Sequence, residues 1–115
     1  MTFQKAVKYD AGKPMWRLLQ WRALRRVAEV ATAGAKKYSP DNWKSFPPDE
    51  ARIRYTDAML RHTAAWLIGE RYDPESGQPH LAHIAWNALS LLEFEEGITP
   101  PPSSPPPTPP VAPSS

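Results

Sequence analysis

Two apolar segments, residues 50–69 and 78–95, place the strongest limits on the fold of this 115-residue chain. Each is long enough for a helix of about five turns, and each is apolar on most sides of a 3.6-residue wheel. A helix that is apolar around most of its circumference is normally buried among other helices. No run of residues alternates convincingly at a period of two. The sequence therefore predicts an all-α domain, a small helical bundle with these two segments at its centre.

A third helix is expected at residues 14–34, because proline suits the first position of a helix and glycine suits its end. Its apolar residues fall on one side of the wheel, so we expect it to be half buried. They are Trp16, Leu19, Ala23, Leu24, Val27, Val30 and Ala31. We take residues 1–98 as one domain. A domain of this size buries only about two-thirds of its unfolded-chain surface, so pairing with another copy would add core.

The C-terminal segment, residues 99–115, contains nine prolines and otherwise only Ser, Thr, Val and Ala, so a disordered tail is expected there. The chain has no cysteine, which excludes disulfides and thiolate-bound zinc. Residues 1–13 lack the apolar core of a signal peptide, and no segment approaches the roughly 18 apolar residues of a membrane span. A cytoplasmic location is the simplest expectation. The net charge of +2 gives little support to nonspecific nucleic-acid binding.

The turn between the two apolar segments carries the densest set of potential metal ligands and proton carriers in the chain. Glu70 and Asp73 have the spacing Glu-x-x-Asp, which on a helix projects two carboxylates toward a shared hard cation. The structural alternative is that Asp73 begins a turn at Pro74 and that Ser76 caps the following helix. The other candidates in this turn are Glu75, His80 and His83.

Polar residues also form stripes along the two central helices. One stripe, spaced i, i+3, i+7, i+10, consists of His80, His83, Asn87 and Ser90. The other, spaced i, i+3, i+7, consists of Arg54, Asp57 and Arg61. Buried polar groups need partners, so we expect the stripes to face each other, a cavity or a subunit interface. The alternative for the second stripe is an internal pairing of Asp57 with one of the two arginines.

Two loops supply cations and aromatic rings. Lys13 precedes the expected N-terminus of the first helix, where free N–H groups and the helix dipole favour anions. Lys36 and Trp43 follow that helix, and a tryptophan face can hold a nucleobase by stacking. The lysines could instead be ordinary solubilising surface, and Trp43 could plug the end of the bundle.

Several motifs follow one another in a distinctive order. They are Tyr9-Asp10 with Lys13, Gly34-Ala35-Lys36-Lys37-Tyr38, Asn42-Trp43, Arg61-His62, Gly69-Glu70, Asp73-Pro74-Glu75-Ser76-Gly77 and His80-Leu81-Ala82-His83. With these motifs the chain resembles the small phage proteins described as dATP/dGTP diphosphohydrolases, relatives of the MazG-like all-α nucleoside triphosphate pyrophosphohydrolases. The resemblance covers about residues 8–95.

The resemblance implies an enzyme that uses Mg²⁺, or Mn²⁺, to hydrolyse dATP or dGTP to the monophosphate and pyrophosphate. It further implies a dimer or tetramer that acts in phage nucleotide-pool control, in the cytoplasm of the host cell. The metal ligands would be Glu70, Asp73, Glu75 and Asp57. The proton would go from water to a carboxylate, Glu70 or Asp73, or to His83. The substrate-binding residues would be Lys13, Lys36, Trp43, Arg61, His80 and Asn87.

Two features leave other classes open. The MazG-like superfamily usually carries a Glu-x-x-Glu pair on the helix before the Glu-x-x-Asp pair, and no Glu-x-x-Glu precedes Glu70 in this chain. His62, His80 and His83 with Asp73 could instead form a nitrogen-rich site in a transition-metal phosphohydrolase. The third class is a noncatalytic phage adaptor or nucleic-acid-associated protein, which would bind a partner through the tail or the basic side of the first helix. The basic residues there are Arg22, Arg25 and Arg26.

Overall fold

The computed structural model describes residues 5–97 of the chain. Its elements, in order, are η1 (Trp16–Leu18), α1 (Trp21–Lys37), η2 (Asn42–Ser45), α2 (Pro48–Leu67) and α3 (His80–Glu95), where η denotes a short 3₁₀ helix. Within residues 5–97 the β-type pairing is limited to one antiparallel bridge between Tyr72 and Pro79. The predicted all-α fold with three main helices is therefore confirmed. The expected tail, residues 99–115, lies outside the described residues.

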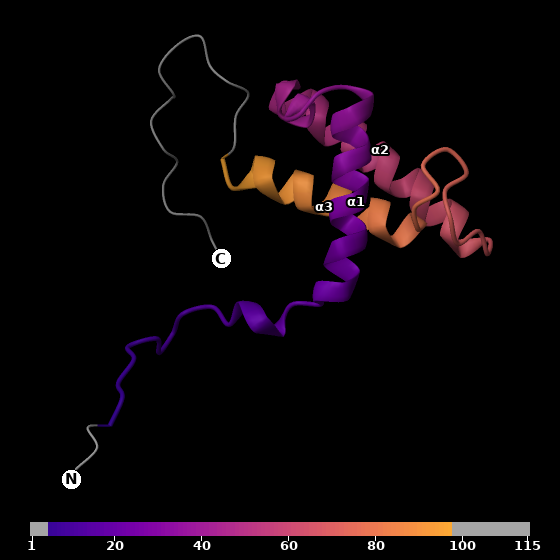
Figure 1. Cartoon of the computed structure of the whole chain (residues 1–115). Coiled ribbons are helices and arrows are strands. Elements are labelled where there is room, and N and C mark those ends of the chain that lie inside the picture. The colour runs from indigo at the N-terminus through magenta and orange to yellow at the C-terminus, as the bar shows by residue number, and fades with distance from the viewer. Residues whose placement is uncertain (1–4, 98–115) are drawn as a thin grey trace.

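The helices α2 and α3 pack on each other as a hairpin, and α1 crosses α3 (Figure 1). The buried apolar residues come from all three helices and are Val27, Val30, Ala51, Tyr55 and Ala82. Next to them lies an aromatic cluster in which Tyr55 meets Trp86 at 5.6 Å between ring centroids. Tyr55 also donates its hydroxyl to the carbonyl of Trp43 at 2.7 Å, which fastens η2 to α2.

The first helix differs from its expected bounds at both ends. Leu19 is extended, with ψ at 153°, and it separates η1 from α1, so a continuous helix from residue 14 is wrong. Residues 5–20 are all exposed, and a short helix without buried apolar contacts has little to stabilise it. At the other end α1 continues past Gly34, and two lysines in its last turn favour the C-terminal end of the helix dipole.

The two central helices lie close to their expected positions. In α2 the proline at residue 48 takes one of the first two helical positions, and acidic residues occupy the first turn. Gly69, with φ at 101°, follows the end of this helix. The third helix begins at His80 and not at residue 78, because the carbonyl of Gln78 accepts a turn hydrogen bond from the N–H of Asp73.

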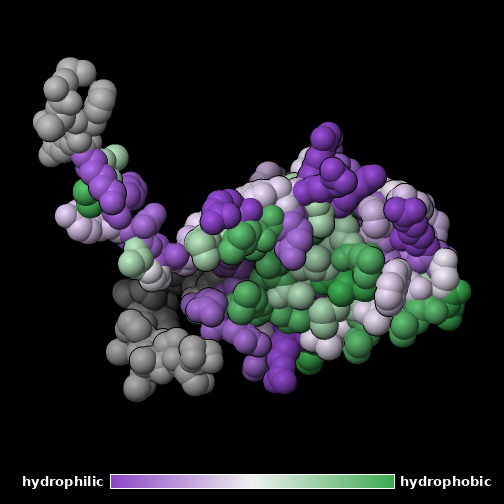
Figure 2. Space-filling view, turned by 90° about the horizontal axis from the view of Figure 1, so that it is seen from below, coloured by the Kyte–Doolittle hydropathy of each residue, from purple (hydrophilic) through white to green (hydrophobic). Residues whose placement is uncertain are grey.

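Much of the apolar surface stays uncovered in a single chain. Residues 80–92 of α3 carry no Asp, Glu, Lys or Arg, yet Leu81, Leu89 and Leu92 are each about half exposed. Figure 2 shows hydrophobic residues gathered over a broad area of the helical body. No large side chain among residues 5–97 is fully buried. A helix expected at the centre of a bundle is thus covered on only part of its circumference.

The chain N-terminal to α1 lies apart from the helices. Residues 5–20 leave the helical body as an exposed arm (Figure 1). Within residues 5–97 no helix is long and apolar enough to cross a membrane.

Candidate metal centre

The turn between α2 and α3 is held by its own hydrogen bonds. The Asp73 carboxylate accepts the N–H of Ser76 at 2.8 Å, and the Asp73 carbonyl accepts the N–H of Gly77 at 2.7 Å. Gly77 has φ at 74°, a conformation that glycine adopts without strain. The N–H of His80 then donates to the carbonyl of Arg71 at 2.9 Å, which closes the turn onto the first residue of α3. Asp73 therefore does begin a turn, as the structural alternative expected.

Contacts with α1 also hold this turn in place. Lys37, at the end of α1, donates to the Glu75 carboxylate, and Gln78 donates to the Glu29 carboxylate at 3.0 Å. These partners lie 38 and 49 residues apart in the sequence. Glu75 and Gln78, on the second half of the turn, thereby join it to a distant helix.

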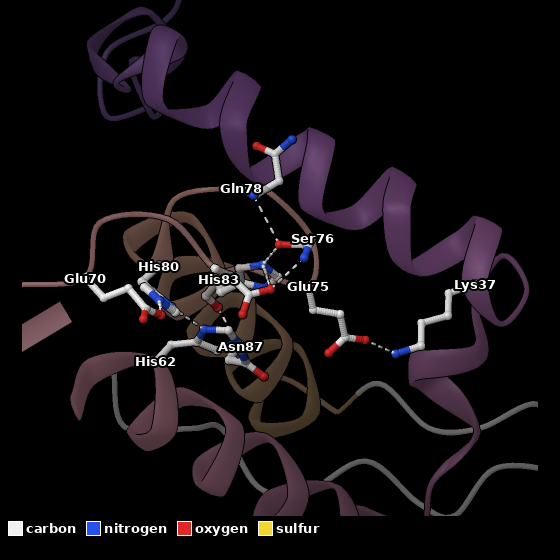
Figure 3. Close-up of polar contacts among 10 residues, drawn as sticks. Lys37, His62, Glu70, Glu75, Ser76, Gln78, His80, His83 and Asn87 are labelled. Carbon is white, nitrogen blue, oxygen red and sulfur yellow. Dashed lines mark hydrogen bonds and ion pairs between the residues drawn. The ribbon is translucent and has the colours of Figure 1, made fainter. Parts of the chain in front are cut away.

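Three imidazoles meet next to this turn (Figure 3). His62 projects from α2, and its Nδ1 lies 2.8 Å from Nδ1 of His80. Its ring also stacks on that of His83, with the centroids 4.2 Å apart and the planes 5° from parallel. The polar stripe predicted on α3 faces inward, since His80, Asn87 and Ser90 are buried and His83 is half buried.

Glu70 sets the tautomer of His80. Its carboxylate lies 2.6 Å from Nε2 of His80, and an ionised carboxylate only accepts hydrogen bonds, so Nε2 carries the proton. The remaining ring nitrogen, Nδ1, faces Nδ1 of His62; one of these two atoms carries the hydrogen of the contact, and a metal ion bound by both nitrogens would take its place. Since the side chain of His80 is only 3% exposed, this pairing fixes the ring in one orientation.

The second half of the cluster joins His83 to the turn. Nε2 of His83 lies 2.6 Å from the Ser76 hydroxyl and 3.8 Å from the Asp73 carboxylate. The same hydroxyl accepts the N–H of Gln78 at 3.1 Å, which holds Ser76 in place. The amide of Asn87 donates to the backbone carbonyl of His83 at 2.8 Å, so this buried residue supports the helix under the cluster.

The ionisation of these groups suits metal binding. Burial, with a smaller contribution from His83, lowers the pKa of His62 to about 4, and burial also lowers the pKa of His83. Burial acts to raise the pKa of Asp73, but hydrogen bonds from Ser76 and the nearby imidazoles outweigh it and hold that pKa below its ordinary value. Near pH 7 His62 and His83 are therefore neutral imidazoles and Asp73 is an ionised carboxylate, the forms that bind cations.

His62, Asp73 and His80 each offer one ligand atom, and these three atoms lie within 4.8 Å of one another. Two nitrogens bound to one ion at about 2.1 Å stand about 3 Å apart in octahedral coordination and about 3.4 Å apart in the tetrahedral coordination of zinc. The 2.8 Å between the two Nδ1 atoms is closer to the octahedral value. A ligand histidine commonly donates its other N–H to a carboxylate, as His80 does to Glu70. The residues therefore fit a divalent ion that accepts imidazole nitrogen, such as Mn²⁺, Fe²⁺ or Zn²⁺, better than Mg²⁺, which prefers oxygen.

The four carboxylates expected to bind the metal do not meet at one point. Asp73 alone belongs to the converging set. Glu70 contacts His80 from behind, and Glu75 points away toward Lys37 (Figure 3). Asp57 is exposed on α2 and lines a separate pocket of about 420 Å³ with Asp49 and Arg52. The Glu-x-x-Asp spacing does not act as a helical pair because Glu70 lies beyond the end of α2, in a turn that folds back.

The residues expected to bind substrate lie in different places. His80 is part of the cluster, whereas Lys13 lies in the exposed arm. Lys36 and Arg61 are exposed, and neither forms an ion pair among residues 5–97. Arg54 pairs with Glu50 at 2.7 Å, so the predicted stripe on α2 is an outer surface and not a buried network.

Trp43 does not offer a free aromatic face. Its ring packs edge-on to Trp86 and Phe94, at 6.3 and 6.0 Å between centroids, and Lys44 lies over it. The expectation of a base platform at Trp43 is therefore a poor fit, and the alternative of a plug at the end of the bundle describes its position.

Sequence reasoning placed His62 in the transition-metal alternative and missed two supporting residues. Ser76 was considered only as a helix cap, although its hydroxyl binds His83. Lys37 was noted only as part of a motif, and no local pattern reports a contact with a residue 38 positions away.

Known proteins give a consistent identification. The family model described as "dATP/dGTP diphosphohydrolase, N-terminal" matches residues 4–99. The chain is also 33% identical, over 86 residues, to a "dATP/dGTP diphosphohydrolase" of Salmonella phage PMBT28. That alignment covers 75% of this chain and 28% of the phage protein, so the chain spans little more than a quarter of that relative. No solved structure matches it. Because the family model covers all three helices and the whole histidine cluster, the chain belongs to the dATP/dGTP diphosphohydrolase family, in the part described as N-terminal.

Proposed function

We propose that this chain hydrolyses a deoxypurine nucleoside triphosphate, dATP or dGTP, to the monophosphate and pyrophosphate, and that it acts in control of the phage nucleotide pool. The observation that carries the proposal is the convergence of His62, Asp73 and His80 in a chain that belongs to this family. The activity named for the phage relative points in the same direction.

The proposed cofactor is a divalent cation, Mn²⁺ or Mg²⁺, with the nitrogen-rich donor set favouring Mn²⁺. His62, Asp73 and His80 would hold it, and Glu70 would orient His80. When bound, such an ion neutralises triphosphate charge and lowers the pKa of a coordinated water.

The reaction needs an acceptor for one proton. A water oxygen attacks the α-phosphorus, the bond from this phosphorus to the bridging oxygen breaks, and pyrophosphate leaves. His83 is suited to take the water proton, because it is half buried, has a lowered pKa and is positioned by Ser76. Arg61, next to His62 in α2, and the exposed Lys36 and Lys13 are the proposed phosphate contacts.

The second candidate is a transition-metal phosphohydrolase with a different cleavage position. The specific observation in its favour is that nitrogen donors outnumber oxygen donors in the cluster. The structure gives less support to the noncatalytic adaptor, because two of the three basic residues proposed to bind a partner, Arg25 and Arg26, pair with Glu29 at 3.6 Å.

A substrate screen tests the proposal. The protein is stripped of metal, reloaded with Mg²⁺, Mn²⁺ or Zn²⁺, and given all ribo- and deoxynucleoside triphosphates, with phosphate and pyrophosphate resolved. We expect pyrophosphate from dATP or dGTP, and faster turnover with Mn²⁺ than with Mg²⁺. His62→Ala should abolish turnover with an unchanged helical CD spectrum, whereas Glu75→Gln serves as the matched control. Orthophosphate as the sole product would reject the cleavage position and favour the second candidate.

We also infer that the chain works as a homo-oligomer. The support is residues 80–92 of α3, which carry no Asp, Glu, Lys or Arg and leave Leu89 and Leu92 about half exposed. A second copy presents the same apolar surface, so two such faces can cover each other about a two-fold axis.

A further inference from the structure

A pocket lies beside the candidate metal centre, on the other side of Glu70. Its volume is about 450 Å³, within the range of small-molecule sites. The lining residues are Trp66, Gly69, Glu70, Arg71, Pro79 and Leu81. Glu70 belongs to both places, because its carboxylate contacts Nε2 of the metal-centre residue His80. A ligand in this pocket would therefore be separated from the ligand atoms of the metal centre by the Glu70 side chain and the His80 ring.

The aromatic wall of the pocket has no partner within the chain. Trp66, in the last turn of α2, is 43% exposed, and its ring meets no other aromatic ring among residues 5–97. An indole face exposed in a pocket suits a flat base, which it can hold by stacking. In this the ring of Trp66 differs from that of Trp43, which is packed against two other aromatic rings.

The pocket also has a cation suited to phosphate. Arg71 forms no ion pair with a carboxylate among residues 5–97, and its guanidinium lies 5.2 Å from the ring of Tyr72. Its backbone is fixed, because its carbonyl accepts the N–H of His80. Arg71 lines the pocket, and a guanidinium is suited to bind a phosphate group.

Gly69 leaves room in the pocket wall, because a Cβ added to this residue would meet no atom of the described residues within 4 Å. Glu70 binds His80 through one carboxylate oxygen, which leaves the other to accept an N–H group of a ligand.

We propose that this pocket binds the base of the nucleotide, with Trp66 stacked on the purine and Arg71 on a phosphate group. The inference rests on the proposed function, because it assumes that the ligand of the metal centre is a nucleotide. It replaces Trp43 by Trp66 as the residue that holds the base.

Calorimetric titration with dGMP tests this inference without turnover, since dGMP is the product and is not consumed. Inorganic tripolyphosphate, which has no base, is the second ligand, and both titrations use Mn²⁺-loaded protein. Trp66→Leu keeps apolar volume but removes the aromatic face. It should weaken dGMP binding about 10- to 100-fold and leave the affinity for tripolyphosphate within about twofold of the native value. Trp66→Phe should restore most of the dGMP affinity. Trp21→Leu, which alters another exposed tryptophan, is the matched control.

Arg71→Ala is a second variant, at an exposed position. It should weaken the binding of both dGMP and tripolyphosphate about tenfold. An unchanged dGMP affinity in Trp66→Leu would overturn the inference, as would an equal loss for dGMP and tripolyphosphate. A change of oligomeric mass in Trp66→Leu with dGMP affinity intact would show that the pocket is a subunit contact, which also overturns it.

The two proposals can fail separately. Trp66-dependent dGMP binding without triphosphate hydrolysis would reject the proposed function and keep the base site. Hydrolysis that does not depend on Trp66 would keep the function and reject the base site.

Discussion

Replacing Glu70 should weaken metal binding even though Glu70 is not one of the three converging ligands. In Glu70→Ala the N–H of His80 loses its acceptor at 2.6 Å, and the ring is no longer held with Nδ1 toward His62. In Glu70→Gln the amide oxygen can still accept this hydrogen bond, but the negative charge is lost.

The size of the effect follows from the role of such partners. Loss of a carboxylate behind a ligand histidine typically costs 10- to 100-fold in metal affinity. This corresponds to about 1.4–2.7 kcal/mol. Glu70→Ala removes both the acceptor and the negative charge behind His80, so it should fall near the upper value. Glu70→Gln should fall near the lower value, because it keeps the hydrogen bond.

Equilibrium dialysis against Mn²⁺ measures these affinities, with CD to confirm that the helices are intact. Glu75→Ala is the matched control, because Glu75 is a carboxylate of the same turn that pairs with Lys37 and not with the cluster. It should stay within about twofold of the native affinity. Equal losses of Mn²⁺ affinity in the Glu70 and Glu75 variants would instead support a site in which carboxylate oxygens bind the metal. A Glu70→Ala protein that binds Mn²⁺ as tightly as the native chain would refute the reasoning.

Three further predictions concern the ligands, the core and the outer surface. His62→Ala removes a direct ligand, so its Mn²⁺ affinity in dialysis should fall below that of Glu70→Ala; a smaller loss would exclude His62 as a ligand. Tyr55→Phe leaves the Trp43 carbonyl without its partner, so urea unfolding should show a loss of about 1–2 kcal/mol, and no loss would contradict this. Burial raises the pKa of Tyr55 to about 12, so from pH 10 to 12 the unfolded tyrosine ionises first and native stability falls, a dependence that Tyr55→Phe should lack. Leu89→Arg should lower the mass found by light scattering, with Arg22→Ala as control, and an unchanged mass would place the subunit contact elsewhere.

The parts of the fold that the sequence predicted well are those with a strong local pattern. The two apolar segments lie close to α2 and α3, because their length and composition leave few other structures. The start of the first helix was missed because Pro14 is a local signal, whereas Leu19 is exposed and extended and separates η1 from α1. The continuation past Gly34 shows that a glycine near a helix end does not require termination there.

The candidate site was predictable only in part, for a related reason. The i, i+3 spacing showed that His80 and His83 share one side of α3. It could not show that His62 meets both of them, because that contact depends on how α2 packs against α3. Likewise, Glu70 was predicted as a ligand on a helix. Its position behind His80 depends on a turn whose path is set by Gly77 and the Tyr72–Pro79 bridge.

The contacts between α1 and the turn bear on the order in which the protein folds. The hairpin of α2 and α3 can form from neighbouring residues, whereas Lys37 with Glu75 and Glu29 with Gln78 join residues 38 and 49 positions apart. A contact between residues far apart in the sequence requires the loop between them to close, which costs conformational entropy before the contact adds stability. Such contacts are therefore expected to form late. Asp73, whose contacts with Ser76, Gly77 and Gln78 are local, is expected to reach its place together with the hairpin. On this view the three candidate ligands come together early, and the docking of α1 onto the outside of the finished turn is the last step.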